Sequence, residues 1–132
     1  MDNLKKLHIT KAYIKNGRVY VHLGGYKLPT KIVKIIEHEP QVGSNYYGGK
    51  KVFIDNDIAN IKHFLLSVSV HEAVEDWLKK TFFPDRHMNE VYKTIHKVAQ
   101  EIEKKFHVRK WGLKSWKEYS RMVNKVWDKE NE

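Results

Sequence analysis

One stretch of this sequence combines residue types that bind metal ions and transfer protons. His71, Glu72 and Glu75 form an HExxE motif, in which a histidine and a carboxylate are separated by four positions. Residues four positions apart lie on the same face of a helix, so His71 and Glu75 could hold one ion together. Glu72 lies about 100° around the helix from His71, which suits a general base acting on a polarised water. The motif therefore predicts a metal-dependent hydrolytic site.

A second segment repeats this combination of one histidine and one carboxylate within an apolar stripe. Its stripe has the 4-3-4-3 spacing of a buried helix face and consists of Tyr92, His96, Ala99, Glu103 and Phe106. The connection TFFPDRH between the two segments is short, which predicts that the two helices are antiparallel neighbours. His96 would then complete a His-Glu-His ligand set, which suits zinc or another divalent transition metal with an open position for water.

The same residues also allow other interpretations. Glu103 lies about 10.5 Å along a helix axis from His96, too far to share its ion, so it could orient a ligand, hold a second ion or pair with a lysine. His71, Glu75 and His96 could instead form a buried hydrogen-bonded cluster without a metal. A di-iron site of the ferritin type is excluded, because it needs two Glu-x-x-His motifs and the chain has none.

The order of strand KKVFID, apolar helix and HExxE resembles the core of zincin-like metallopeptidases. The chain is most similar to a family of small, mostly uncharacterised phage and archaeal-virus proteins, in which HExxE is followed by YxxxHxxAxxxE and later by GxxxWxxY. The resemblance covers about residues 52–120, and the residues of the two later motifs are Tyr92, His96, Ala99, Glu103, Gly112, Trp116 and Tyr119.

This resemblance implies a zinc-dependent hydrolase acting on a peptide or amide bond of a peptide or protein substrate. Zincins carry a second histidine at the end of the motif and often a distal glutamate, whereas this chain has Glu75 and His96 at those places. The ligand types are thus exchanged but kept. The resemblance assigns the metal to His71, Glu75 and His96, catalysis to Glu72, and supporting roles to Tyr92 and Glu103.

The elements that must position these residues change in character near residue 57. Residues 1–57 are rich in turns and β-branched residues, and they predict an antiparallel sheet of about four strands. The first two strands are expected to form a hairpin around Asn16-Gly17, with Ile14 opposite Val19 and Ala12 opposite Val21. The third and fourth strands are TKIVKIIEHE and KKVFID.

Residues 58–132 have the apolar periodicity of three helices, so the predicted fold class is α+β in a single domain, 1–132. The first helix spans about residues 60–80, and the second runs from an N-cap at Asp85 to about Phe106. The third begins at Ser115, where Ser-Trp-Lys-Glu has the pattern of a capping box. The first two helices are expected to form the hairpin that carries the metal site.

Composition excludes several classes of protein. The 132 residues are 41% hydrophobic and contain no cysteine, which excludes wholesale disorder, a disulfide scaffold and a cysteine zinc finger. No apolar run approaches the roughly 20 residues of a membrane span, and no secretory signal is recognisable, so we expect an intracellular protein, in the host cytoplasm if it is viral. Abundant Lys and Glu without Cys are also typical of thermophile proteins.

Positive charge is concentrated near the C-terminus. The net charge is +9, and residues 104–125 contain eight Lys or Arg and one acidic residue. Basic residues interleaved with tryptophan predict, as an alternative function, nucleic-acid binding without catalysis. A solvated lysine-rich surface and a structural or host-interaction protein of a virus are further interpretations. The candidate nucleic-acid surface consists of Lys104, Lys105, Arg109, Lys110, Trp111, Lys114, Lys117 and Arg121.

Overall fold

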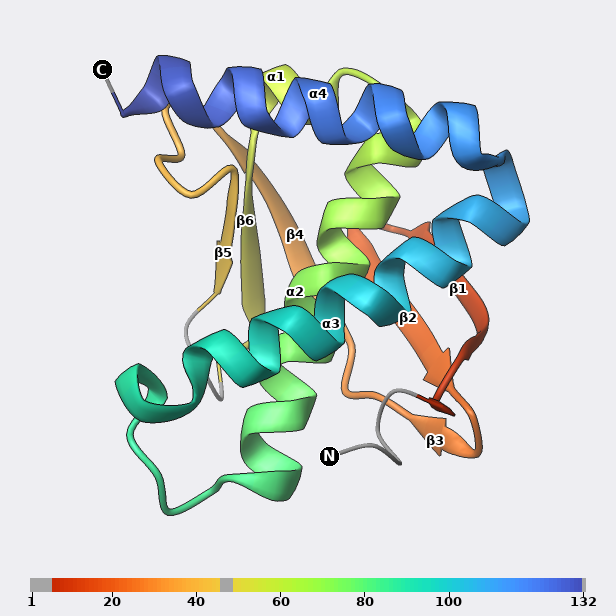
Figure 1. The fold of residues 1–132 in the computed structure, drawn as a ribbon, viewed down its shortest axis with the longest axis vertical. Coiled ribbons are helices and arrows are strands. Elements are labelled where there is room, and N and C mark those ends of the chain that lie inside the picture. The colour runs from red at the N-terminus through yellow and green to blue at the C-terminus, as the bar shows by residue number, and fades with distance from the viewer. Residues whose placement is uncertain (1–5, 46–48, 132) are drawn as a thin grey trace.

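The computed structural model describes residues 6–45 and 49–131, which form a sheet followed by helices (Figure 1). This arrangement confirms the predicted α+β class. The strands are β1 (Ile9–Lys15), β2 (Arg18–Leu23), β3 (Tyr26–Lys27), β4 (Lys31–Ile36), β5 (Gly43–Asn45) and β6 (Lys51–Asp55). The helices are α1 (Asn56–Ala59), α2 (Lys62–Phe82), α3 (Met88–Trp111) and α4 (Leu113–Glu130).

The first two strands form the predicted hairpin. Asn16 and Gly17 both adopt positive φ, 53° and 72°, as a two-residue turn of this type requires. The register is the expected one, with Ile14 opposite Val19 and with Ala12 opposite Val21. The hairpin therefore turns a buried apolar face toward the helices.

The sheet is mixed, and here the prediction of a purely antiparallel sheet is wrong. The strand order is β1-β2-β4-β6-β5, with β3 paired to β2, and β4 runs parallel to β6. The connection between β4 and β6 contains β5, and β6 starts at the same end of the sheet as β4. The short strand β5 pairs antiparallel with β6 and forms one edge of the sheet.

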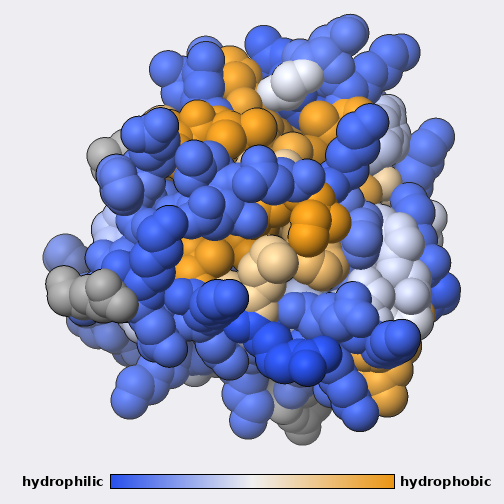
Figure 2. Space-filling view, turned by 90° about the horizontal axis from the view of Figure 1, so that it is seen from above, coloured by the Kyte–Doolittle hydropathy of each residue, from blue (hydrophilic) through white to orange (hydrophobic). Residues whose placement is uncertain are grey.

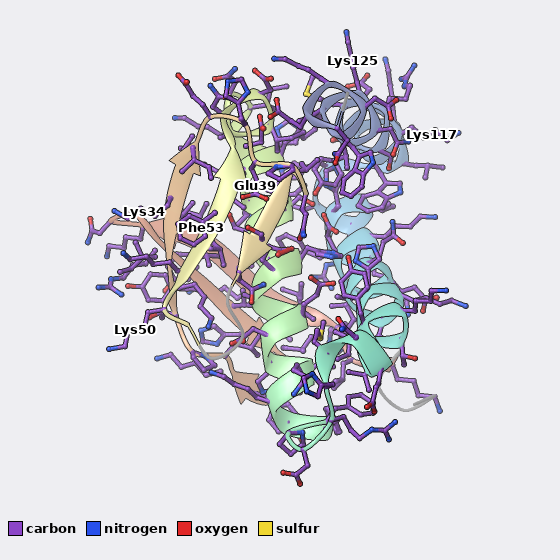
Figure 3. All side chains as sticks on the ribbon, turned by 90° about the vertical axis from the view of Figure 1, so that its left-hand side faces the viewer. Lys34, Glu39, Lys50, Phe53, Lys117 and Lys125 are labelled. Carbon is purple, nitrogen blue, oxygen red and sulfur yellow. The ribbon has the colours of Figure 1, made fainter. Side chains whose placement is uncertain are left out.

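Helix α2 is the central element of the molecule. It lies between the sheet and α3, while Lys34 projects from the opposite face of the sheet (Figures 1 and 3). Residues 66–76 of α2 are all buried, because neighbours cover the helix on nearly every side. A polar residue in this stretch must find a partner inside the protein, since burial without one is costly. The HExxE motif lies in this stretch.

The last two helices begin at other residues than expected. Asp85 does not cap α3; the N-cap is His87, which makes no side-chain capping bond. Gly112, with φ 95°, separates α3 from α4, so Ser115 lies inside α4 and is not its cap. Helix α4 crosses one end of α2 and α3 (Figure 1).

Seen from the side of α4, apolar side chains form a band that hydrophilic ones border (Figure 2). The inner side of α4 packs into a hydrophobic cluster with Ile54 of β6, Ile58 of α1 and Phe64 of α2. This cluster fixes α4 over the end of α2. Within the part of the chain that the structure describes, no helix is both long and apolar enough to cross a membrane.

Candidate metal centre

Three side chains from two helices converge at one point. His71 and Glu75 come from α2 and His96 from α3, and together they form a group that could hold a metal ion. His71 Nε2 lies 3.3 Å from Glu75 Oε2 and 3.2 Å from His96 Nδ1. His96 Nδ1 lies 3.0 Å from Glu75 Oε2. The two helices are neighbours, as the short connection predicts, and they bring the expected residues together.

The spacing of the three atoms suits a small tetrahedral ion. Ligands about 2.05 Å from a tetrahedral zinc ion lie about 3.3 Å from one another. The three observed separations, 3.0–3.3 Å, are close to that value. Nitrogen and carboxylate oxygen are also donor types that zinc accepts. The same separations are those of hydrogen bonds, so the cluster fits a small ion and equally fits the metal-free hydrogen-bonded group.

The charges of the cluster are strongly coupled. Burial alone would lower the pKa of His71, but the carboxylates of Glu75 and Glu103 outweigh it and raise this pKa well above its ordinary value. Burial would raise the pKa of Glu75, yet its interactions with His71 and His96 lower this pKa to about 2. The buried Glu75 therefore stays ionised, and the cluster favours a positive charge at its centre.

Glu72 lies beside the cluster but contributes none of its three converging atoms. Its Oε1 accepts a hydrogen bond of 3.1 Å from Asn45 Nδ2 of β5, and the same amide donates to the Glu72 carbonyl at 3.2 Å. Burial, followed by the charge of Glu75, raises the pKa of Glu72 to about 8. A carboxyl group with a pKa near neutrality can both take up and release a proton under ordinary conditions.

Glu103 does not join the cluster but supports it. Its Oε1 lies 2.9 Å from His71 Nδ1, so of the three roles open to Glu103 this contact fits the first, in which Glu103 orients the ring of a candidate ligand. Its Oε2 accepts a bond of 2.6 Å from the Ser67 hydroxyl, and the buried Tyr119 hydroxyl also bonds to this carboxylate. Glu103 is therefore held by several donors, and through it the ring of His71 is fixed.

Tyr92 stands at the outer side of the cluster. Its ring stacks on that of His96, with centroids 5.3 Å apart, and its hydroxyl is 3.5 Å from His96 Nδ1. Burial and the carboxylates of Glu75 and Glu72 raise the pKa of Tyr92 to about 12. The hydroxyl thus remains a hydrogen-bond donor at neutral pH.

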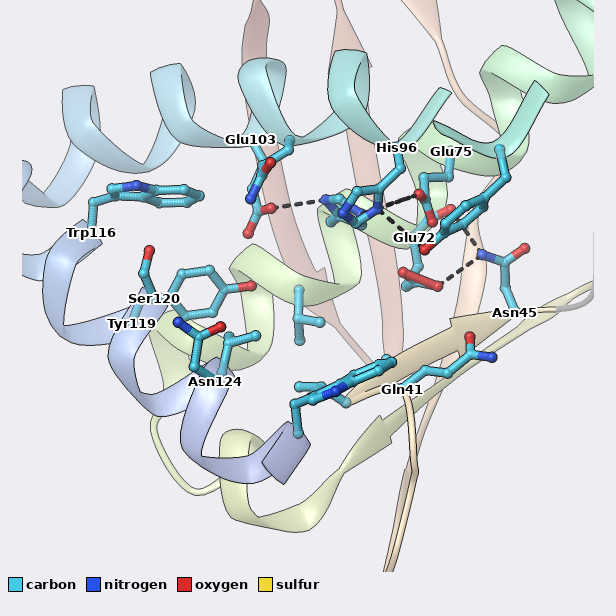
Figure 4. A pocket seen from close by; sticks show the side chains of 18 of the residues that line it. Gln41, Asn45, Glu72, Glu75, His96, Glu103, Trp116, Tyr119, Ser120 and Asn124 are labelled. Carbon is cyan, nitrogen blue, oxygen red and sulfur yellow. Dashed lines mark hydrogen bonds and ion pairs between the residues drawn. The ribbon is translucent and has the colours of Figure 1, made fainter. Parts of the chain in front are cut away.

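The cluster opens into a trough of about 830 Å³ (Figure 4). Glu72, Glu75 and His96 lie at one end, Asn45 and Gln41 approach from the β5 side, and α4 closes the other end. The trough is therefore large enough to admit a substrate segment next to the cluster.

Sequence reasoning missed several members of this site. Asn45 lies in β5, a strand that the sequence pattern does not predict, and its contact with Glu72 depends on the tertiary placement of β5. His107 had no expected role, although it is fully buried and bonds to Ser67 Oγ at 3.0 Å and to Ser115 Oγ at 2.8 Å. A usable signal existed, because Ser67 precedes His71 by four positions and His107 follows Glu103 by four.

The candidate nucleic-acid surface lies elsewhere. Its lysines are exposed, and Lys117 projects away from the body of the protein (Figure 3). Arg109 is bonded to the carbonyl oxygen of Ile9. Trp111 is partly buried, with its ring against those of Phe106 and His107, so its faces are partly occupied by neighbours.

Comparison with protein-family models, with curated proteins and with solved structures finds no match to this chain.

Proposed function

We propose that this chain is a small zinc-dependent hydrolase of the zincin-like type that cleaves a peptide or amide bond. The observation that supports it most is the convergence of His71 Nε2, Glu75 Oε2 and His96 Nδ1 within 3.0–3.3 Å of one another at one end of a trough. Zinc, when bound by these residues, would supply Lewis-acid polarisation of a water molecule or a carbonyl group.

Glu72 is the proposed general base. Its carboxyl group is next to the cluster and is oriented by Asn45, and its raised pKa suits a group that carries a proton back and forth. Glu72 takes a proton from the attacking water as the new carbon–oxygen bond forms. It then delivers that proton to the amide nitrogen, whose bond to carbon breaks. The Tyr92 hydroxyl stays protonated, so it can donate a hydrogen bond to substrate at the same end of the trough.

Metal analysis and turnover test this proposal together. Protein purified without an affinity tag or added metal should contain about one zinc per chain, and it should cleave members of a mixed peptide library. Glu75→Ala and His96→Ala should lose zinc and turnover, because each removes one of three ligands. Glu72→Gln should keep zinc and lose turnover, because it removes only the base.

Lys93→Ala provides the matched control, since Lys93 is exposed on the same helix as His96 and does not line the trough. It should match the wild-type protein in both zinc content and turnover. The proposal would be refuted if the purified protein contained no metal and a chelator left its melting temperature unchanged. Loss of zinc in Glu72→Gln equal to that in Glu75→Ala would make Glu72 a ligand and remove its assignment as base.

A further inference from the structure

The end of the trough that faces α4 has a composition of its own. Beyond the metal cluster, the trough continues along the inner side of α4 (Figure 4). Trp116 and Tyr119 are buried there, whereas Trp127 is 46% exposed at its rim. Aromatic and aliphatic side chains with a few polar groups make this end suited to a bulky substrate group. The α4 residues that line it are Trp116, Tyr119, Ser120, Val123, Asn124 and Trp127.

The charge of the trough differs from that of the molecule. The chain carries 25 Lys and Arg residues, yet no lysine or arginine among residues 6–45 and 49–131 lines the trough. Its acidic lining groups are Glu72, Glu75 and Glu103. The cations of α4 point elsewhere, as Lys117 and Lys125 show (Figure 3). At the α4 end an anionic group would meet the Glu103 carboxylate, to which Tyr119 of α4 bonds, and no lysine or arginine among the described lining residues would compensate the charge, so this end disfavours it.

The opposite wall presents features that match a polypeptide. This wall contains Gly43 and Asn45 of β5, the edge strand of the described sheet. A Cβ atom at Gly43 would lie 2.8 Å from Val68 Cγ2, so glycine allows β5 to approach α2 this closely. An edge strand offers backbone donors and acceptors, which a peptide backbone can match and a sugar ring cannot match in the same register. The amide side chains of Gln41 and Asn124 add neutral hydrogen-bonding groups.

We propose that the α4 end of the trough is a subsite for a bulky uncharged side chain of a polypeptide substrate and that it rejects acidic side chains. This inference rests on the proposed hydrolase function for its biological meaning. It rests for its physical content on the aromatic lining of α4 and on the absence of lysine and arginine from the described lining residues.

Titration of the 15N-labelled protein by NMR tests the subsite, with and without zinc. The probes are N-acetyl-phenylalanine amide, N-acetyl-aspartate amide and N-acetylglucosamine. The chain has four tryptophans, of which Trp116 and Trp127 line the trough, whereas Trp77 and Trp111 do not. The phenylalanine derivative should shift the indole signals of the first pair and leave the second pair unchanged. It should half-saturate at a concentration at least fivefold lower than the aspartate derivative.

Two variants on α4 sharpen the result. Trp127→Ala should weaken binding of the phenylalanine derivative at least threefold, with the Trp116 signal as readout. Lys125→Ala, two positions away and directed outward, should leave it unchanged (Figure 3). Equal affinity for the two amino-acid derivatives, tighter binding of N-acetylglucosamine, or shifts confined to Trp77 and Trp111 would overturn the proposal.

The two proposals fail in different ways. If zinc does not bind but the phenylalanine derivative still perturbs Trp116 and Trp127, the hydrolase proposal falls and the subsite stands. If zinc and turnover are present but the probes show no side-chain preference, the subsite falls and the hydrolase stands.

Discussion

At the scale of single residues, the two ring nitrogens of His71 have different partners, and this difference defines the cluster. Nδ1 lies 2.9 Å from the Glu103 carboxylate, which can only accept when ionised, so Nδ1 carries a proton. In the neutral ring, the lone pair of Nε2 then faces Glu75 Oε2 at 3.3 Å and His96 Nδ1 at 3.2 Å. A lone pair opposite a carboxylate is repulsive unless a proton or a metal cation lies between them, and the raised pKa of His71 places a proton there when no metal is bound. Glu103 therefore presents His71 to a metal ion in the tautomer that ligation requires.

Replacement of Glu103 tests this orientation. Glu103→Gln keeps the shape of the side chain but removes the charge that holds the His71 ring, and loss of such a supporting group typically costs about 10–100-fold in metal affinity. Competition with a chelating dye should show a decrease of this size. Glu118→Gln, exposed on α4, should leave zinc affinity unchanged. Unchanged affinity in Glu103→Gln would show that the contact is only structural.

The residues of the cluster and the supporting Glu103 could be predicted from the sequence, whereas the supporting Asn45 could not. His71 and Glu75 are four positions apart, and His96 occupies the same kind of stripe on the next helix. Asn45 could not be assigned, because its contact with Glu72 depends on which strand lies next to α2. The packing of the whole sheet determines which strand lies there, and the periodicity of the sequence does not indicate it.

At the scale of elements, the cluster joins α2 to α3, since its residues come from both helices. Binding of an ion to the folded state alone adds about 4 kcal/mol at a thousandfold excess over Kd, which raises the melting temperature of a domain of this size by roughly 10–20 °C. Zinc should therefore raise the melting temperature, and a chelator should reverse the rise. Glu75→Ala should show no response to either, whereas Glu118→Ala should respond like the wild type. Equal melting curves with and without zinc would contradict this role.

His107 connects three helices through hydrogen bonds that its neutral form can make. Ser115 Oγ of α4 can donate to Nε2, Nδ1–H can donate to Ser67 Oγ of α2, and the Ser67 hydroxyl donates to Glu103. When His107 is uncharged, each hydrogen-bonding group in this series of contacts has a partner. Burial lowers the pKa of His107, with the nearby carboxylate of Glu103 opposing and His63 adding to the decrease. His107 is therefore protonated less readily in the folded protein than in the unfolded chain.

This difference predicts a pH dependence of stability. Because the pKa of His107 is lower in the folded state, its contribution is complete above the ordinary histidine pKa of about 6.5 and is lost as the pH falls below it. His107→Gln should cost about 1–3 kcal/mol at pH 7.5, since buried partners lose their bonds. Chemical denaturation of the metal-free proteins should show a smaller further loss between pH 7.5 and 5.5 in His107→Gln than in wild type. His8→Asn, at an exposed position, should follow the wild type, and parallel pH curves for His107→Gln and wild type would exclude the effect.

Among the elements, the hairpin and the three long helices could be predicted, and the parallel pairing could not. Asn16-Gly17 fixes the β1–β2 register by local turn geometry. The pairing of β4 with β6 depends on the connection between them, in which β5 has only three residues and pairs antiparallel with β6. Hydrophobic alternation is the same in parallel and antiparallel strands of this length, so the sequence pattern does not distinguish the two pairings.

At the scale of the whole molecule, the excess positive charge and the candidate metal centre lie in different regions of the protein. The net charge is +9, yet the titratable groups among the described lining residues of the trough are Glu, His and Tyr. The lysines of α4 point outward, so electrostatic attraction of a polyanion would act on the outside of the protein (Figure 3). At physiological ionic strength such charges interact over only about 8 Å. Polyanion binding and metal binding should consequently be independent properties of this fold.

A triple substitution on α4 tests that independence. Lys114, Lys117 and Arg121 are exposed and line no part of the trough. If they contact a single-stranded oligonucleotide, replacing all three by alanine should reduce the slope of log affinity against log salt concentration by about 2, because each lost phosphate contact contributes about 0.7. Zinc affinity and the turnover of peptides should stay within twofold of wild type. Lys34→Ala, on the far face of the sheet, is the matched control and should leave the slope unchanged. An unchanged slope in the triple variant would exclude these residues as a nucleic-acid surface, and a parallel loss of zinc affinity would show that the two regions are coupled.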